Sequence, residues 1–317
     1  MFSGIYNGKQ KHKADLPVVL QRAKDAGVQE MIVTAGCLAE AKAAAELCSE
    51  HPGLRFTVGV HPTRCMEFLP ESERASVLQS CGEATEAAWE PTAEQLQHAE
   101  AYLAQLRQVA EQGIESGTLA AIGECGLDYD RLHFCPAPVQ RFFFQWHFAL
   151  AHSLDLPMFL HNRNTQGDFV AALKLNTSTF TRGVAHSFTG GGAELAALLQ
   201  AGLYIGLNGC SLKTAENCTV AASVPLDRLM LETDCPWCEI RPSHPSHAHV
   251  HSSWPVKKKE KWEADSTVKG RNEPCHMAAV AEVVAGIMQR PLLEVEEAAW
   301  NNASAVFGCA NGVKAAT

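Results

Sequence analysis

The sequence has 317 residues, 46% of them apolar and without an extended low-complexity tract, so the chain can bury a large core. Its formal net charge of −9 disfavours broad electrostatic binding to nucleic acid, although metal ions and a few local cations can still hold a nucleic-acid substrate. No apolar stretch approaches the ~18 residues that span a bilayer, and residues 1–13 are polar and basic, unlike a secretory signal. Twelve cysteines in apolar or helical settings are typical of reduced thiols, so we expect an intracellular protein of the nucleus or cytoplasm with no membrane partner.

The predicted elements alternate between helices and short strands. A helix-like segment at 13–26 comes first, with its apolar residues on one face. Seven continuous apolar runs typical of buried parallel strands follow, at 30–34, 55–60, 119–123, 157–161, 182–186, 203–207 and 228–233. Helical segments at 39–48, 139–154, 168–175 and 193–201 lie between them. This alternation predicts an α/β fold, a TIM-type (β/α) barrel in which residues 1–317 form a single domain.

A TIM-type barrel has eight strands, and seven are visible here. Because a helix-like segment precedes the first of them, the missing strand would lie before residue 1. A central strand buries about three to five apolar side chains at ~1.5–3 kcal/mol each, which rivals the net stability of a domain. We therefore expect a shortened product of a longer protein that melts early or aggregates when purified as written.

Two long stretches interrupt the alternation. Residues 70–117 are rich in Glu, Ala and Gln and predict a helical insertion with one helix at 92–112. Residues 239–270 predict a long polar loop, which carries histidines at 244, 247, 249 and 251 and then lysines at 257–259. Asn272 and Pro274 indicate the start of a helix, and two helices at 275–289 and 293–306 would end the fold.

Four predicted strands end in a residue that can bind a metal ion: Glu124, His161, His186 and Asp234. The carboxyl ends of parallel strands in a barrel converge on one mouth. A single His in an apolar run is more often a core residue than a ligand, but this objection weakens for four residues at four strand ends. Oxygen and nitrogen donors suit a divalent cation such as Mg²⁺, Mn²⁺ or Zn²⁺. We predict one or two such ions per chain.

Three further residues are candidates for catalytic roles. Glu232 stands two positions before Asp234, so in a strand both would face the mouth, with Glu232 one layer deeper and orienting a ligand or a water. Asp234 would also accept the proton of the attacking water. Arg163 follows His161 by two residues and suits a phosphate oxygen pair, although a structural salt bridge explains it equally well. His61 ends its strand and would contact substrate or protonate a leaving group.

Three other motifs favour simpler explanations. Cys235 and Cys238 form a C-x-x-C pair, but the pair follows the last strand, where two thiols flanking a turn are favoured over a redox site. The histidines at 244–251 favour a solvated loop over a metal site. The lysines at 257–259 favour a solvated charge run, with a nucleic-acid contact or a weak nuclear signal as the alternative.

The motifs together resemble those of the TatD-type metal-dependent deoxyribonucleases, and most of all the eukaryotic branch of that family. The segments that carry the resemblance are 123–129 (GECGLDY), 160–164 (LHNRN), 186–188 (HSF), 231–236 (LETDCP), 271–274 (RNEP), 61–65 (HPTRC) and 211–214 (SLKT). The similarity runs over about residues 1–307, with an insertion near 75–100. One departure is the His-x-His pair of the family's first strand, to which nothing here corresponds.

The resemblance implies a (β/α) barrel that hydrolyses DNA phosphodiester bonds with a metal-activated water, in DNA catabolism. It implies the ligands Glu124, His161, His186 and Asp234, with Glu124 bridging if two metals bind. A related amidohydrolase acting on a small ester or amide is the first alternative, although Glu124 stands where many amidohydrolases carry a modified lysine. A truncated, non-catalytic module that binds nucleic acid or protein is the second. The sequence leaves the oligomeric state open.

Overall fold

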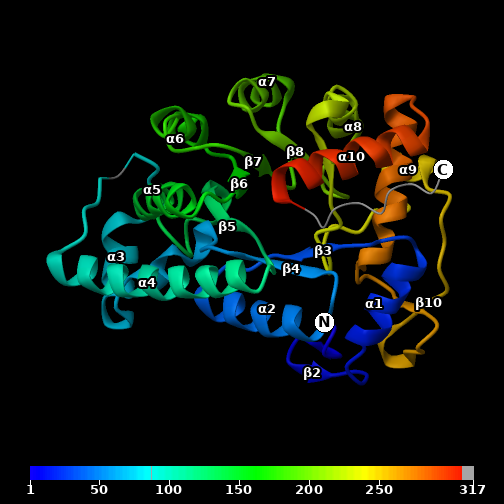
Figure 1. Ribbon diagram of the computed structural model, residues 1–317, viewed down its shortest axis with the longest axis horizontal. Helices are drawn as coiled ribbons and strands as arrows, with labels where there is room; N and C mark the ends of the chain where they lie inside the picture. Colours follow the sequence, from blue (N-terminus) through cyan, green and yellow to red (C-terminus); the bar gives the residue numbers. More distant parts are fainter. Residues whose placement is uncertain (87, 309–317) are drawn as a thin grey trace. The chain divides into compact units, whose positions relative to one another are not determined.

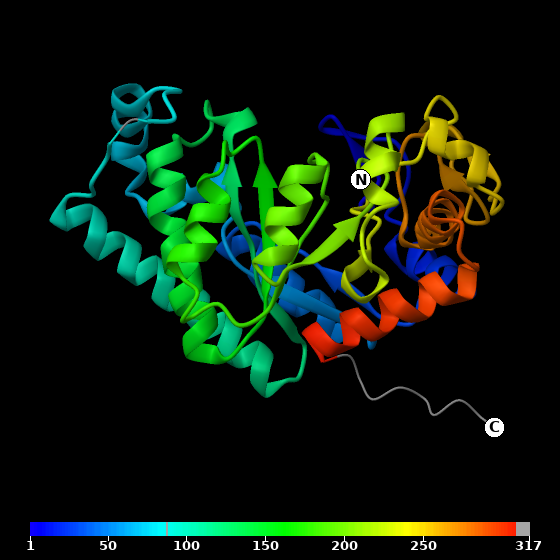
Figure 2. The same cartoon turned by 90° about the horizontal axis from the view of Figure 1, so that it is seen from above.

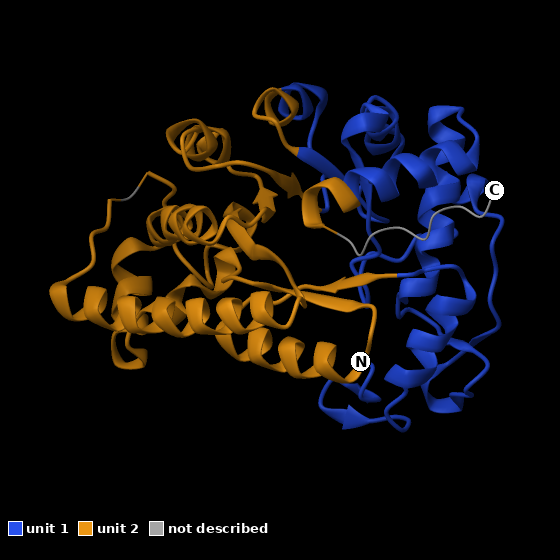
Figure 3. Ribbon diagram, in the orientation of Figure 1, with its two compact units in different colours: residues 1–29, 187–196, 204–303 blue, residues 30–186, 197–203, 304–317 orange. Residues whose placement is uncertain are grey.

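The computed structural model describes residues 1–86 and 88–308. The chain divides into two compact units (Figure 3). Unit 1 comprises residues 1–29, 187–196 and 204–303, and unit 2 comprises the described residues of 30–186, 197–203 and 304–308. The assignment of 1–317 to a single domain stays a prediction. No helix in the described part of the chain is long and apolar enough to cross a bilayer.

Seven parallel strands confirm the predicted α/β architecture of the TIM-barrel type. In sheet order, which is also chain order, they are Met31–Val33 (β3), Leu54–Val58 (β4), Leu119–Asp128 (β5), Met158–Arg163 (β6), Gly183–Ala185 (β7), Tyr204–Leu207 (β8) and Leu229–Leu231 (β9) (Figure 1). Their continuous apolar sequences follow from this arrangement, because a parallel strand covered by helices is buried on both faces. Phe56, Val58 and Leu160, for example, are fully buried.

Unit 2 holds β3 to β7 with their helices. These are Leu38–Glu50 (α2), Glu71–Cys81 (α3), Ala93–Glu115 (α4), Ala137–Leu154 (α5) and Asp168–Leu175 (α6), with short 3₁₀ turns at Pro62–Phe68 (η1) and Tyr129–Arg131 (η2). Helix α2 packs against β4 and α4, and α5 packs against β5 (Figure 2). Phe68 and Phe143 stack with their ring centres 4.3 Å apart in this core. Within the stretch 70–117 the structure has two helices, α3 and α4, and Thr92 begins the longer one with a capping box to Gln95.

Unit 1 holds β8 and β9 together with the remaining short elements. The strands are Ile5–Tyr6 (β1), Lys9–Gln10 (β2), Val256–Lys257 (β10) and Thr267–Val268 (β11), and the helices are Leu16–Asp25 (α1), Ala215–Ala221 (α8) and Met277–Met288 (α9). The 3₁₀ turns are Leu226–Arg228 (η3), Pro245–His249 (η4), Lys259–Lys261 (η5) and Pro274–His276 (η6). The division of the chain into units falls within two helices, Gly192–Gln200 (α7) and Leu292–Phe307 (α10).

A buried ionic network ties the first helix of unit 1 to the segment before α9. Arg271 makes two parallel hydrogen bonds to Asp15, of 2.9 and 2.7 Å, and a third of 2.7 Å to Glu273, and all three side chains are fully buried. Trp262 Nε1 donates to Asp15 Oδ2 at 2.8 Å. A buried guanidinium requires such partners, because an unpaired buried charge is strongly destabilising.

Four predicted strand ends were wrong by two residues or more. β4 ends at Val58, so His61 lies after the strand and begins η1, and β6 continues past His161 to Arg163. The other two errors change the setting of carboxylates. β5 does not stop at Gly123 but continues through Glu124 to Asp128, because it pairs with β6 over that whole length. β9 ends at Leu231, so Glu232 and Asp234 lie in the loop that follows. Asp234 has a φ of 49°, which is not strand geometry, and the inference that both side chains share a strand face therefore fails.

Candidate functional site

Glu124 is presented by an irregularity in β5. The pairing with β6 shifts between Gly123 and Cys125, so Glu124 is the extra residue of a β-bulge. Gly123 has a φ of 143°, and a Cβ atom at this position would clash with the carbonyl oxygen of Phe159. Only glycine tolerates both conditions. The bulge turns the Glu124 side chain toward the histidines described next.

Three donor atoms of unit 2 converge from strands β5 and β6 and from the residue that follows β7. Glu124 Oε1 lies 2.8 Å from His161 Nδ1 and 2.8 Å from His186 Nε2, and the two nitrogens are 3.2 Å apart. The three side chains are only 16%, 10% and 6% exposed. Donors around one tetrahedral Zn²⁺ at roughly 2.0–2.2 Å lie roughly 3.3–3.6 Å from one another, so these three atoms would move apart by less than about 1 Å to bind one ion. The Glu–His–His set therefore fits a divalent cation in its chemistry and lies close to the spacing of ligands.

The electrostatics of this group favour an anionic carboxylate. Burial opposes ionisation of Glu124, but the charge of His186 and the hydrogen bonds from His161 and His186 outweigh it and hold the pKa of Glu124 well below its usual range. Glu124 is therefore ionised at neutral pH and lies within hydrogen-bonding distance of one nitrogen of each imidazole. A buried carboxylate beside two imidazole nitrogens provides one anionic oxygen and two nitrogen donors for a cation.

His61, predicted as a catalytic residue, lies beside the same carboxylate. Its Nδ1 accepts a hydrogen bond of 3.2 Å from the Thr63 backbone, which leaves the ring proton on Nε2, 3.4 Å from Glu124 Oε1. Burial lowers the pKa of His61 to about 4, despite the opposing charge of Glu124. The ring is therefore neutral at neutral pH, so it can donate a hydrogen bond to a substrate but is a poor proton source for a leaving group.

Asp128 is a site residue that sequence reasoning missed. It is the last residue of β5 and is 1% exposed. Its Oδ2 lies 3.3 Å from Nε2 of His161, and the trio His61, Asp128 and His161 forms a second group whose ligand atoms lie within 4.8 Å of one another. The available signal was its place in the motif GECGLDY, but an expected strand end at Gly123 put Asp128 in a loop.

Arg163 is the last residue of β6, and its Cα pairs in register with that of Asp128. It makes no hydrogen bond or ion pair with residues 1–86 or 88–308. The alternative of a structural salt bridge at Arg163 therefore finds no support in this part of the chain. An uncommitted guanidinium at the end of a site strand is available for an anionic substrate.

Glu232 and Asp234 belong to unit 1 and make their described contacts there. Glu232 accepts hydrogen bonds from the backbone N of Ser187 at 3.0 Å and from Asn208 Nδ2 at 3.3 Å. Ser187 directly follows His186 in the sequence. Asp234 Oδ2 accepts from the Cys238 thiol at 3.1 Å. Their predicted roles at the metal stay predictions.

The C-x-x-C motif does not pair with itself. The sulfur of Cys238 lies 2.8 Å from that of Cys210, in the loop after β8, rather than beside Cys235. Gly209 permits this approach, since a Cβ there would clash with the Cys238 carbonyl oxygen. The eleven cysteines described are free thiols, in keeping with the expected reduced state.

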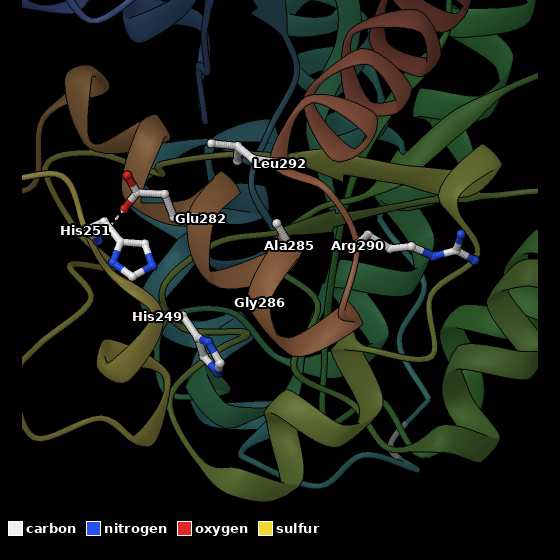
Figure 4. A pocket seen from close by; sticks show the side chains of 7 residues that line it. All are labelled: His249, His251, Glu282, Ala285, Gly286, Arg290 and Leu292. Atoms are coloured by element: carbon white, nitrogen blue, oxygen red, sulfur yellow. Dashed lines mark hydrogen bonds between the residues drawn. The ribbon is translucent and has the colours of Figure 1, made fainter.

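The histidine-rich loop forms a shallow pocket of unit 1 rather than a metal cluster. His249 and His251 line it with Glu282, while Arg290 extends away from them (Figure 4). The Glu282 carboxylate accepts from the backbone N atoms of His251 and Ser252 at 2.7 to 3.0 Å. Among the described residues, no metal-binding group includes these histidines.

The lysine run after this loop also has local partners. Lys257 pairs with Glu263 at 3.2 Å, and the ammonium of Lys259 lies 5.1 Å from the ring centre of Tyr6. These contacts fit the simpler prediction of a surface charge run.

Parallel strands of a βα sheet that deliver a carboxylate and two imidazoles to one point define a metal-dependent hydrolase of the TIM-barrel type. Comparison with known proteins gives the family. The chain belongs to the TatD related DNase family, whose model matches residues 6–308. The predicted family, hydrolase class and fold are thereby confirmed.

Individual relatives agree with this assignment. The chain is 40% identical over 305 residues to a protein of Schizosaccharomyces pombe named deoxyribonuclease Tat-D, covering 95% of this chain and 90% of the relative. It is 31% identical to the 3'-5' ssDNA/RNA exonuclease TatD of Erwinia amylovora, covering 93% and 94%. A solved structure from Saccharomyces cerevisiae, described as an uncharacterized amidohydrolase, superposes with a TM-score of 0.84 at 32% identity, covering 97% and 96%.

Proposed function

We propose that this chain hydrolyses phosphodiester bonds in DNA, with single-stranded DNA as the first substrate to test. The observation that carries the proposal is the convergence of Glu124 Oε1, His161 Nδ1 and His186 Nε2 within 3.2 Å of one another. The names of the fission-yeast and Erwinia relatives support DNA as the polymer. We infer that one or two divalent cations, Mg²⁺, Mn²⁺ or Zn²⁺, bind here, with Asp234 as a further ligand.

A bound divalent cation at such a site lowers the pKa of a water ligand and polarises a phosphoryl oxygen. Glu124 supplies the anionic donor and the two histidines supply neutral ones. Asp234 accepts the proton of the attacking water, and Glu232 orients a ligand or a water. Arg163 binds a non-bridging phosphate oxygen pair, because its guanidinium has no competing partner among the described residues. His61 donates a hydrogen bond from Nε2 to a substrate oxygen.

The test is cleavage of end-labelled single-stranded DNA with each of the three metals. We expect Glu124→Gln, His161→Ala and Asp234→Asn each to lower the rate by roughly 100-fold or more, because each removes a donor or the proton acceptor. Asp168→Asn is the matched control, since Asp168 is a carboxylate of α6 that is 40% exposed and pairs with Arg141 at 3.1 Å. Undiminished cleavage by Glu124→Gln would show that the site is wrong.

The same preparations separate the two alternatives. The yeast structure described as an amidohydrolase keeps a small-molecule ester or amide in consideration, so a panel of nitrophenyl esters and phosphodiesters is assayed beside DNA. Activity confined to the carboxylic esters would favour the amidohydrolase. Folded protein that holds less than about 0.2 metal ion per chain and cleaves nothing would favour a non-catalytic binding module. A nuclear or cytoplasmic location is also proposed, on the free thiols.

A further inference from the structure

The two ring nitrogens of His161 face different carboxylates. Nδ1 lies 2.8 Å from Glu124 Oε1 and belongs to the group of three donors. Nε2 faces away from it, is buried, and lies 3.3 Å from Asp128 Oδ2. That contact is within hydrogen-bonding distance but outside ordinary hydrogen-bond alignment, and Nε2 has no other partner among the described residues. A buried imidazole N–H normally requires an acceptor, and Asp128 is the acceptor at hand.

The surroundings hold Asp128 in place for this contact. Fully buried Gln140 of α5 accepts from the Asp128 backbone N at 2.8 Å and donates to its carbonyl oxygen at 2.9 Å. Asp128 Oδ1 accepts from the backbone N of Asp130 at 3.0 Å, which leaves Oδ2 directed at His161. Arg131 approaches Oδ2 only to 3.9 Å and is more than half exposed, so water screens it.

We infer that Asp128 is the positioning residue of the metal centre: it keeps the proton of His161 on Nε2 and thereby aims the Nδ1 lone pair at the site shared with Glu124 and His186. This inference rests on the proposed function, because it assigns a role toward the same cation. Metal-bound histidines almost always donate their second N–H to a carboxylate, carbonyl or water in this way.

The trio His61, Asp128 and His161 has a competing explanation, in which these residues bind a second cation of their own. That arrangement would require His161 to lose both ring protons and bind an ion through each nitrogen. It would also require Nε2 of His61, which the Thr63 contact leaves protonated. The positioning role needs neither change. The two explanations predict different metal stoichiometries when Asp128 is replaced.

The experiment measures metal binding directly, without activity. Mn²⁺ and Zn²⁺ affinity and stoichiometry are determined by calorimetry with chelator competition for the wild type, Asp128→Leu, Asp128→Asn, and the control Asp168→Asn. We expect Asp128→Leu to weaken affinity by about 10–100-fold at unchanged stoichiometry, Asp128→Asn to weaken it less, and the control to bind as the wild type. Nitrogen NMR, with the His161 signal assigned by His161→Gln, should show the Nε2–H form in the wild type and a mixed form in Asp128→Leu.

Three results would overturn the positioning role: wild-type affinity in Asp128→Leu, an unchanged His161 tautomer in that variant, or loss of one ion with the remaining affinity intact. The last result would establish the second metal site. Circular dichroism checks that each variant is folded. If Asp128→Leu does not fold, the nearly isosteric variant Asp128→Asn takes its place in the test. Glu124→Gln separates this inference from the proposed function. If Glu124→Gln binds metal as the wild type does, the proposed function fails. If Glu124→Gln abolishes metal binding while Asp128→Leu leaves the affinity unchanged, only the positioning role fails.

Discussion

His147 makes the stability of unit 2 sensitive to acid. It lies in α5, fully buried, with Nδ1 donating to the Phe143 carbonyl at 2.8 Å and Nε2 accepting from the Val60 backbone N at 3.0 Å. Both nitrogens are committed, one as donor and one as acceptor, so only the neutral ring fits. Protonation would place an N–H at Nε2 opposite the N–H of Val60, directly before the site residue His61. Burial accordingly lowers the pKa of His147 to about 4.

The magnitude follows from linkage. The unfolded chain holds this imidazole with a pKa of about 6.5, so between about pH 6.5 and about pH 4 the unfolded state binds the proton and the folded state does not. The contribution of His147 to stability is therefore fully present above the unfolded pKa and is lost as the pH falls through this window. With these two values, the free energy of unfolding should drop by about 2 kcal/mol between pH 7 and pH 5 through His147 alone.

The assay is urea unfolding followed by circular dichroism at pH 7, 6 and 5, for the wild type and for His147→Gln. Glutamine keeps an acceptor near the Val60 N–H but does not titrate. We compare how much stability each protein loses on acidification, because the substitution also lowers stability at every pH. Burial also lowers the pKa of His61 and His276, and their contributions cancel in this comparison. If both proteins lose the same free energy from pH 7 to pH 5, the reasoning about His147 is refuted.

Two further predictions concern the cores of the units. Arg271→Met should destabilise unit 1 by about 3–5 kcal/mol, because it strands the fully buried carboxylates of Asp15 and Glu273, and a melting temperature that barely moves would contradict this. Leu106→Ala, in the buried face of α4, should cost about 2–5 kcal/mol, whereas Leu293→Ala, at a side chain 63% exposed, should cost under about 0.5 kcal/mol. Equal costs in denaturant titrations would show that the cavity argument fails for α4.

The strands were predictable because their residues are buried on both faces and read as continuous apolar runs. β4 and β8 lie within three residues of the expected bounds for this reason. The end of β5 was predicted wrongly, because a glycine such as Gly123 or Gly126 usually indicates the end of a strand. Here their positive φ values instead accommodate a bulge and a close approach to β6, where a Cβ on Gly126 would clash with the His161 carbonyl oxygen. Whether a glycine ends a strand or bends it depends on the neighbouring strand.

The sequence by itself determined the alternating architecture, the family motifs and the candidate metal ligands, because each is written in local order and residue type. Tertiary structure alone decided which side chains lie together. The bulge at Glu124, the approach of His161 Nε2 to Asp128, and the approach of Cys238 to Cys210 rather than Cys235 all depend on atoms far apart in the chain. Such contacts follow from the register and burial of whole strands, which no single motif contains.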